Sequence, residues 1–158
     1  MTAAAAAREA LACRESVPKK SLCQADGLMD IQWYRRYLEY FNARNYDGVL
    51  SHFADAFDLS FAGYHFRTKE EVRRFYQFFH EHVDEAIDLK AFVGNAEMVA
   101  IEVVVRLTGK KELTPSALEK AGYGRLVPLA VGQVVEIPQY IHYHLRDGKI
   151  VVVGCAMA

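Results

Sequence analysis

Residues 31–53, IQWYRRYLEYFNARNYDGVLSHF, decide the fold that we expect for the rest of the chain. Apolar side chains recur at helical spacing in the first half of this stretch and give one predicted helix an apolar face. They are Ile31, Tyr34, Leu38 and Phe41. Tyr37 lies beside this face and can carry a hydroxyl group into an apolar interior. The pattern breaks at residues 45–48, and a short second helix is predicted to follow.

The composition limits the classes of function that fit. The chain has 158 residues, of which 52% are hydrophobic and 12% aromatic, and its formal net charge is −1. This length suits one domain with a core and a small cavity. The nearly balanced charge argues against nucleic acid and anionic membrane surfaces as partners. No apolar run approaches the roughly 20 residues that a membrane-spanning helix needs.

The cysteines indicate an intracellular protein, and the short motifs give no sign of a cofactor. Cys13, Cys23 and Cys155 are an odd number of cysteines without the spacing of a metal site. We interpret them as reduced thiols, which predicts a cytoplasmic location. The sequence has no glycine-rich phosphate loop, no Cys–His nucleophile pair and no nucleotide fingerprint. We therefore expect neither a cofactor nor a bound metal.

The chain divides into an extension and one domain. An alanine run followed by mixed charges predicts a flexible N-terminal extension over residues 1–27, and a single domain is expected over residues 28–158. Within this domain, residues 110–129 interrupt the strand pattern. Thr114-Pro115 predicts the start of a short helix there and Gly122 its end. This insertion is expected either to cover a pocket as a lid or to elaborate the surface or a dimer interface.

The remaining pattern predicts an α+β domain. Thr68 and Glu71 form a capping box that starts a third helix, which we expect to run to about Glu85. Apolar runs predict the strands, and the longest strand is expected to bend near Pro138. The expected strands are residues 57–61, 64–67, 89–93, 99–107, 130–145 and 150–155. We therefore predict three N-terminal helices packed on a strongly curved, mainly antiparallel sheet, with a conical hollow between them.

Five short motifs occur in the order and spacing of a known superfamily. They are 37–42 YLEYFN, 47–48 DG, 53–55 FAD, 73–76 RRFY and 147–150 DGKI. Over residues 30–155 the chain resembles the nuclear transport factor 2-like (NTF2-like) superfamily, and in particular its SnoaL-like polyketide cyclases and ketosteroid isomerases. The resemblance implies a cone-shaped fold with an apolar pocket, and a homodimer formed through the outer face of the sheet.

The resemblance also implies roles for individual residues. The tyrosine that hydrogen-bonds the substrate oxygen in ketosteroid isomerases corresponds to Tyr37, and the tyrosine that supports it corresponds to Tyr76. The two functional aspartates of those isomerases fall near Phe61 and Ile141, and the last strand lacks the acid that SnoaL-type cyclases place there. The phenol pair can donate hydrogen bonds to a developing oxyanion, or it can be a mutually satisfied pair in the core.

Strand parity adds further candidates on the long strand. Side chains at the odd-numbered positions are expected to point into the interior. They are Gln133, Gln139, Ile141, Tyr143 and Leu145. Gln139, Ile141 and Tyr143, together with Trp33 and Phe61, are the expected substrate-binding residues. Gln139 can orient a carbonyl group, and Tyr143 can donate a hydrogen bond or line the wall.

Polar side chains occupy the even-numbered positions of the same strand. They are Glu136, Tyr140, His142 and His144. We expect an outer sheet face or a dimer interface here, although two histidines on one side of a strand can also bind a metal. A bulge at Pro138 would turn these histidines inward. His65, near the expected opening of the cone, is expected to be either a general base or an exposed hairpin residue.

Two functions from different classes fit this sequence. The first is a cofactor-independent isomerase, cyclase or dehydratase that acts on a hydrophobic, oxygenated small molecule, polyketide- or terpenoid-like, with Tyr37, Tyr76 and His65 as catalytic residues. The second is a non-catalytic ligand-binding or dimerisation module, which the missing aspartates favour. A cavity that contains a titratable acid or base favours the enzyme, whereas a cone filled by side chains favours the module.

Overall fold

The structure is a computed structural model that describes residues 29–157, so the predicted N-terminal extension lies outside the described residues. The helices are α1 (Ile31–Asn42), α2 (Tyr46–Leu50), α3 (Lys69–His82) and α4 (Pro115–Ala121). The strands are β1 (Phe53–Phe61), β2 (Tyr64–Phe66), β3 (Val83–Gly94), β4 (Met98–Gly109), β5 (Val134–Arg146) and β6 (Lys149–Met157). Within the described part of the chain, none of the helices has the length and apolar character that a membrane crossing requires.

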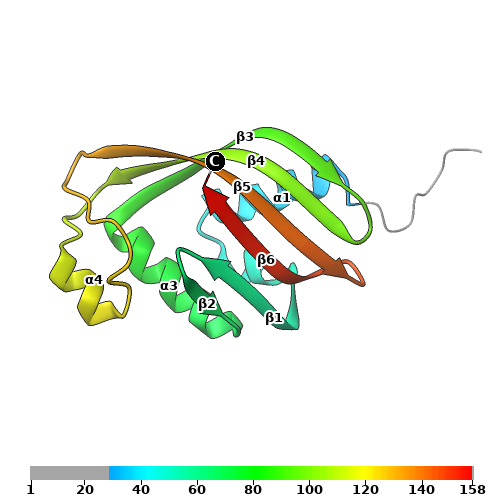
Figure 1. Cartoon of the computed structure of the whole chain (residues 1–158), viewed down its shortest axis with the longest axis horizontal. Coiled ribbons are helices and arrows are strands. Elements are labelled where there is room, and N and C mark those ends of the chain that lie inside the picture. The colour runs from blue at the N-terminus through cyan, green and yellow to red at the C-terminus, as the bar shows by residue number, and fades with distance from the viewer. Residues whose placement is uncertain (1–28, 158) are drawn as a thin grey trace, which may run out of the picture.

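The six strands form one sheet in the order β2-β1-β6-β5-β4-β3. Neighbouring strands are antiparallel, except for β1 and β6, which run parallel. Helices α1 and α3 lie on one side of the sheet, and β3, β4 and β5 arc over them (Figure 1). The hydrophobic core lies between these two layers. The structure therefore confirms the predicted α+β architecture of helices packed on a curved, mainly antiparallel sheet.

Side-chain caps fix the starts of the two longer helices. The Asp30 carboxylate accepts a hydrogen bond from the backbone N–H of Trp33 at 2.9 Å and thereby starts α1. In the predicted capping box, the Thr68 hydroxyl accepts from the backbone N–H of Glu71 at 3.2 Å, and the Glu71 carboxylate accepts from that of Thr68 at 3.0 Å. Helix α3 therefore begins where the sequence predicts.

The end of α3 differs from the prediction. The helix ends at His82 and strand β3 begins at Val83, whereas a helix to about Glu85 and a strand from Leu89 were expected. Val83 has an extended backbone, with φ −128° and ψ 135°, and already pairs with β4. The physical reason is that the β-branched Val83 opens an alternating run, which fits a strand better than a helix. Glu85 therefore lies on a strand, on the same face as Ile87.

Strand β5 begins later than predicted, at Val134 instead of residue 130, and it has no bulge at Pro138. Its pairing with β4 is continuous from Val134 to His144, with no irregularity at Pro138. Among residues 29–157, β6 pairs with β5 from Gln139 onward, so no described residue pairs with Pro138 on that side of β5. A strand tolerates proline at such an edge position. Gln133 lies before β5 and is exposed, so it does not belong to the predicted inward face.

The insertion, residues 110–129, is packed against the end of β1. The Thr114 hydroxyl caps α4 by accepting from the backbone N–H of Ala117 at 3.1 Å. Gly122 ends α4 at φ 85°, a left-handed conformation that favours glycine, so both ends of this helix agree with the prediction. Beyond the helix, Arg125 Nη1 donates to the carbonyl oxygen of Gly63 at 2.6 Å. This contact fastens the insertion to the turn between β1 and β2.

Candidate active site

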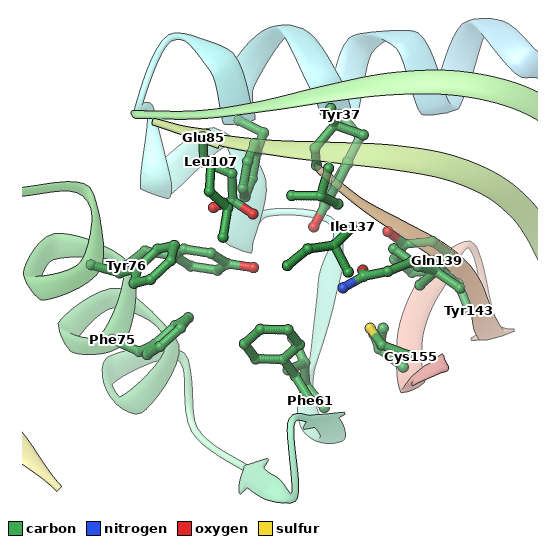
Figure 2. Close-up of a pocket in the computed structure, with 17 residues that line it drawn as sticks. Tyr37, Phe61, Phe75, Tyr76, Glu85, Leu107, Ile137, Gln139, Tyr143 and Cys155 are labelled. Carbon is green, nitrogen blue, oxygen red and sulfur yellow. The ribbon is translucent and has the colours of Figure 1, made fainter. Parts of the chain in front are cut away.

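A cavity of about 70 Å³ lies between the inner face of the sheet and helices α1 and α3 (Figure 2). Most of its lining is apolar or aromatic. Its main polar groups come from Tyr37 of α1, Tyr76 of α3, Glu85 of β3, and Gln139 and Tyr143 of β5. An apolar space with a few converging polar groups is the usual form of a small-molecule site.

A larger hollow of about 420 Å³ adjoins this cavity. The two spaces share walls, which include Phe61, Gln139 and Cys155. The rim of the larger hollow includes residues 125–127, which belong to the insertion. The insertion therefore borders the hollow that adjoins the cavity.

The two predicted phenols, Tyr37 and Tyr76, line the same cavity. Burial raises the pKa of both hydroxyls well above the ordinary value, and the nearby Glu85 carboxylate raises the pKa of Tyr76 further. Both phenols are therefore neutral at physiological pH and can donate hydrogen bonds. Within residues 29–157 the two hydroxyls do not hydrogen-bond each other. The Tyr76 hydroxyl instead points into the open space of the cavity (Figure 2).

The cavity also contains a carboxylate that was not predicted from the sequence, that of Glu85. The Glu85 side chain is 12% exposed, and its Oε2 lies 2.9 Å from Nε2 of His80, whose side chain is 3% exposed. The Nδ1 of the same imidazole lies 3.0 Å from the hydroxyl of Tyr46. Burying a charged or polar group costs free energy unless it has a partner, and here each group has one.

The sequence does contain a signal for this acid. Val83, Glu85, Ile87 and Leu89 have the same parity, and polar or small residues lie between them. This period of two places Glu85 on the apolar face of a strand. The sequence prediction extended the third helix to about Glu85 and began the next strand at residue 89. Glu85 was therefore not assigned to a strand, and the signal was not seen.

The structure brings most of the predicted site residues together. Those that line the cavity are Tyr37, Phe61, Tyr76, Gln139, Ile141 and Tyr143. Trp33 does not line it, because its ring stacks behind that of Tyr37 with the centroids 6.3 Å apart. His65 lies outside it as well, on β2, with its side chain 55% exposed and its Nδ1 2.8 Å from Oδ1 of Asp58. The structure therefore gives no support to His65 as a base in this cavity.

The comparison with protein families identifies the chain. The model of the SnoaL-like domain matches residues 34–153, which is more than half of the sequence. The chain belongs to the SnoaL-like family. The matched region of this SnoaL-like protein contains every polar residue named above for the cavity. No curated protein matches the chain significantly in sequence.

Solved structures show the fold of the SnoaL-like protein. A "putative polyketide cyclase" from a Silicibacter species is 23% identical, over 80% of this chain and 87% of that chain, with a TM-score of 0.65. A protein of the same description from Xanthomonas campestris is 22% identical, over 78% and 86%, with a TM-score of 0.63. An "LEH-like epoxide hydrolase" from Mycobacterium tuberculosis is 12% identical, over 81% of each chain, with a TM-score of 0.58. Together with the family match, these similarities confirm an NTF2-like fold.

Proposed function

We propose that this SnoaL-like protein is a cofactor-independent isomerase, cyclase or dehydratase that acts on a hydrophobic, oxygenated small molecule of polyketide- or terpenoid-like chemistry. The observation that carries the proposal is the meeting of the Glu85 carboxylate and the Tyr76 phenol in one apolar cavity. The structural neighbours include two proteins described as a "putative polyketide cyclase" and one described as an "LEH-like epoxide hydrolase", which supports small-molecule chemistry of this kind.

The three reactions can begin with the same proton transfer. The Glu85 carboxylate takes a proton from the carbon next to a substrate carbonyl, and the C–H electron pair becomes the C=C bond of an enolate. The carbonyl oxygen takes the negative charge and accepts hydrogen bonds from Tyr37 and Tyr76. Glu85, now neutral, returns the proton to another carbon in an isomerisation, to a new alkoxide in a cyclisation, or to a departing hydroxide in a dehydration.

The cavity walls support this assignment of the base. The positions near which the resemblance places the aspartates of ketosteroid isomerases hold Phe61 and Ile141, and both form apolar wall. Glu85 reaches the same space from β3, so a different strand supplies the acid. The apolar walls exclude water, which strengthens the hydrogen bonds that form on the enolate oxygen.

Deuterium exchange tests the proposal without knowledge of the natural substrate. The protein is incubated in D₂O with a panel of apolar cyclic ketones, and proton NMR follows the loss of signal from the carbons next to the carbonyl. We expect the wild-type protein to accelerate exchange for at least one ketone, and Glu85→Gln to lower that rate by about 10²- to 10⁴-fold.

The matched control is Glu102→Gln, because Glu102 is exposed on β4 and does not line the cavity. This variant is expected to keep the wild-type rate. A Glu85→Gln protein that is folded by circular dichroism and as fast as the wild type would remove Glu85 from the mechanism.

A non-catalytic ligand-binding module is the second candidate. The small volume of the inner cavity, about 70 Å³, and the apolar residues in place of the isomerase aspartates favour it. Native mass spectrometry of the protein with the same ketones separates the two functions. Ketones that bind without any catalysed exchange would support the module, whereas binding together with exchange supports the enzyme.

The proposal also includes a lid-like role for residues 110–129 and a cytoplasmic location.

We further propose a homodimer formed through the outer face of the sheet. This face offers apolar surface next to polar side chains. Tyr140 is 46% exposed and Val152 42% exposed, and His142 and His144 lie exposed on the same face of β5. An exposed face of this mixed kind is suited to contact with a second copy of the chain.

A further inference from the structure

We infer that His80 and Tyr46 are positioning residues for Glu85: together they hold one carboxylate oxygen, Oε2, and leave the other, Oε1, free to take the substrate proton. The inference rests on the proposed function, in which Glu85 is the base. Both ring nitrogens of the buried His80 have partners, since Nε2 contacts Glu85 and Nδ1 contacts Tyr46. The three side chains form a chain of hydrogen bonds that starts at α2 and ends in the cavity.

Tyr46 determines which nitrogen of His80 carries the proton. Burial raises the pKa of the Tyr46 hydroxyl, so this group keeps its proton and can donate it to a hydrogen bond. Its oxygen lies 3.0 Å from Nδ1 of His80 but 3.4 Å from the backbone oxygen of Tyr76, so Nδ1 is the better acceptor. An Nδ1 that accepts leaves the ring proton on Nε2, where it donates to Glu85.

Aromatic neighbours fix the orientation of the His80 ring. The imidazole stacks on Tyr76 and on Tyr46, with centroids 5.2 Å and 5.9 Å away and interplanar angles of 22° and 13°. Phe41 meets the same ring edge-on, at 5.5 Å and 83°. The ring cannot rotate to exchange its two nitrogens without disturbing these contacts. The Nε2 donor is therefore held in a constant direction relative to Glu85.

The two oxygens of Glu85 are consequently not equivalent. Oε2 accepts the hydrogen bond from His80, whereas Oε1 has no hydrogen-bond partner within the described residues. The nearby Arg44 does not compete for the carboxylate, because its guanidinium donates to the backbone oxygen of Glu85 and to Asp84. In this arrangement Oε1 is therefore the oxygen that takes the substrate proton, and Oε2 is the oxygen that fixes the position of the carboxylate.

Nitrogen-15 NMR of labelled histidines tests the positioning in the free protein, independently of catalysis. In the wild type we expect His80 in a single tautomer, with Nε2 protonated and Nδ1 unprotonated. Tyr46→Phe keeps the stacked ring and removes the donor to Nδ1, so we expect a mixture of His80 tautomers. Tyr64→Phe is the control, because this phenol contacts the insertion and not His80. An unchanged single tautomer in Tyr46→Phe would overturn the role of Tyr46.

The ketone exchange assay gives a second readout. His80→Leu removes the donor to Oε2, so we expect kcat to fall by about 10²-fold at unchanged KM, because the orientation of Glu85 is lost and ligand contacts are not. His80→Gln can still donate an amide N–H and is expected to recover part of that loss. His82→Gln is the matched control, since His82 is also buried on α3 but its Nδ1 contacts the backbone oxygen of Phe78 at 2.9 Å.

The outcomes for the two proposals are distinguishable. A wild-type rate in folded His80→Leu would overturn the positioning role and leave the proposed function intact. Absence of catalysed exchange in the wild-type protein, with every ketone, would contradict the proposed function. In that case the tautomer of His80 and its dependence on Tyr46 still decide whether this hydrogen-bond chain holds Glu85.

Discussion

The rings of Tyr76 and His80 stack on each other one helical turn apart on α3, with their centroids 5.2 Å apart. Tyr76 therefore has two parts with separate tasks: its hydroxyl faces the cavity, and its ring supports the imidazole beside Glu85. We expect Tyr76→Phe to lower the ketone exchange rate by about tenfold or more and to leave the nitrogen-15 signals of His80 unchanged. Tyr76→Leu should lower the rate and change those signals as well. Equal signals in both variants would contradict the supporting role of the ring.

Tyr34 and Tyr37 are neighbouring buried phenols on α1 with opposite expected behaviour. Tyr37 lines the cavity, so Tyr37→Phe should lose most of the exchange activity while the protein stays folded. In residues 29–157 the buried Tyr34 hydroxyl makes no hydrogen bond of ordinary geometry, although the phenol of Tyr143 is near enough to influence its pKa. Tyr34→Phe removes this unpaired group and should raise the free energy of unfolding by about 1 kcal/mol without loss of activity. Urea denaturation and the exchange assay measure both effects, and retained activity in Tyr37→Phe would exclude Tyr37 from the mechanism.

Cys155 reports on access to the cavity. Burial, with a further contribution from Glu85, raises the pKa of the Cys155 thiol from 9.0 to about 12. Only the thiolate reacts with iodoacetamide, and a raised pKa lowers the thiolate fraction at every pH below it. In a Cys13→Ser/Cys23→Ser background, the alkylation rate should therefore rise about tenfold per pH unit from pH 7 to pH 10 without levelling off. A plateau near pH 9 would show an unperturbed thiol, and a bound ketone should slow the reaction.

His65 and Glu85 make competing predictions about the general base. His65 is exposed and contacts Asp58, whereas Glu85 lines the cavity. On the Glu85 proposal, His65→Gln should keep the exchange rate within about twofold of the wild type, because substitutions at exposed positions have small effects. Rates are compared in the same ketone assay. A large loss in His65→Gln, with Glu85→Gln still active, would reverse the assignment.

The outer sheet face makes the proposed dimer testable. Tyr140 is 46% exposed at the centre of β5, and we expect Tyr140→Glu to convert a dimer to a monomer, because it places a charge in an apolar contact. Light scattering during size-exclusion chromatography measures the mass. Val131→Glu is the control, because Val131 is 66% exposed and precedes β5, outside the sheet. A wild-type protein that is monomeric at high concentration would contradict the proposal.

Local chemistry explains which parts of the fold the sequence could predict. The start of α3 depends on the reciprocal hydrogen bonds of Thr68 and Glu71, and the limits of α4 depend on Thr114 and Gly122, so a few adjacent residues suffice. The end of α3 depends on distant residues. The alternating run that begins at Val83 is only a weak local signal, and it becomes a strand because β4, from another part of the chain, pairs with it.

The candidate site, too, could be predicted only where local sequence was sufficient. The resemblance leads to Tyr37 and Tyr76 because both lie on helices whose inner faces are visible in the sequence. Strand parity correctly placed Gln139 and Tyr143 in the cavity wall. Glu85 was missing from the prediction because the predicted helix continued to it, which hid the alternating pattern that runs from Val83 to Leu89. Only the pairing of β3 with β4 turns its carboxylate inward, away from water.

The place of β6 in the sheet has a consequence for how the protein is made. Strand β6 lies between β1 and β5 and is the link that joins β2-β1 to β5-β4-β3. Residues 149–157 are synthesised after the other strands that the structure describes, so this sheet cannot close until they leave the ribosome. Val153 and Cys155 are also part of the cavity wall, so the ligand site does not exist before that moment. Until then the apolar faces of both halves are open to water, and we expect the nascent chain to need protection by chaperones until β6 has emerged.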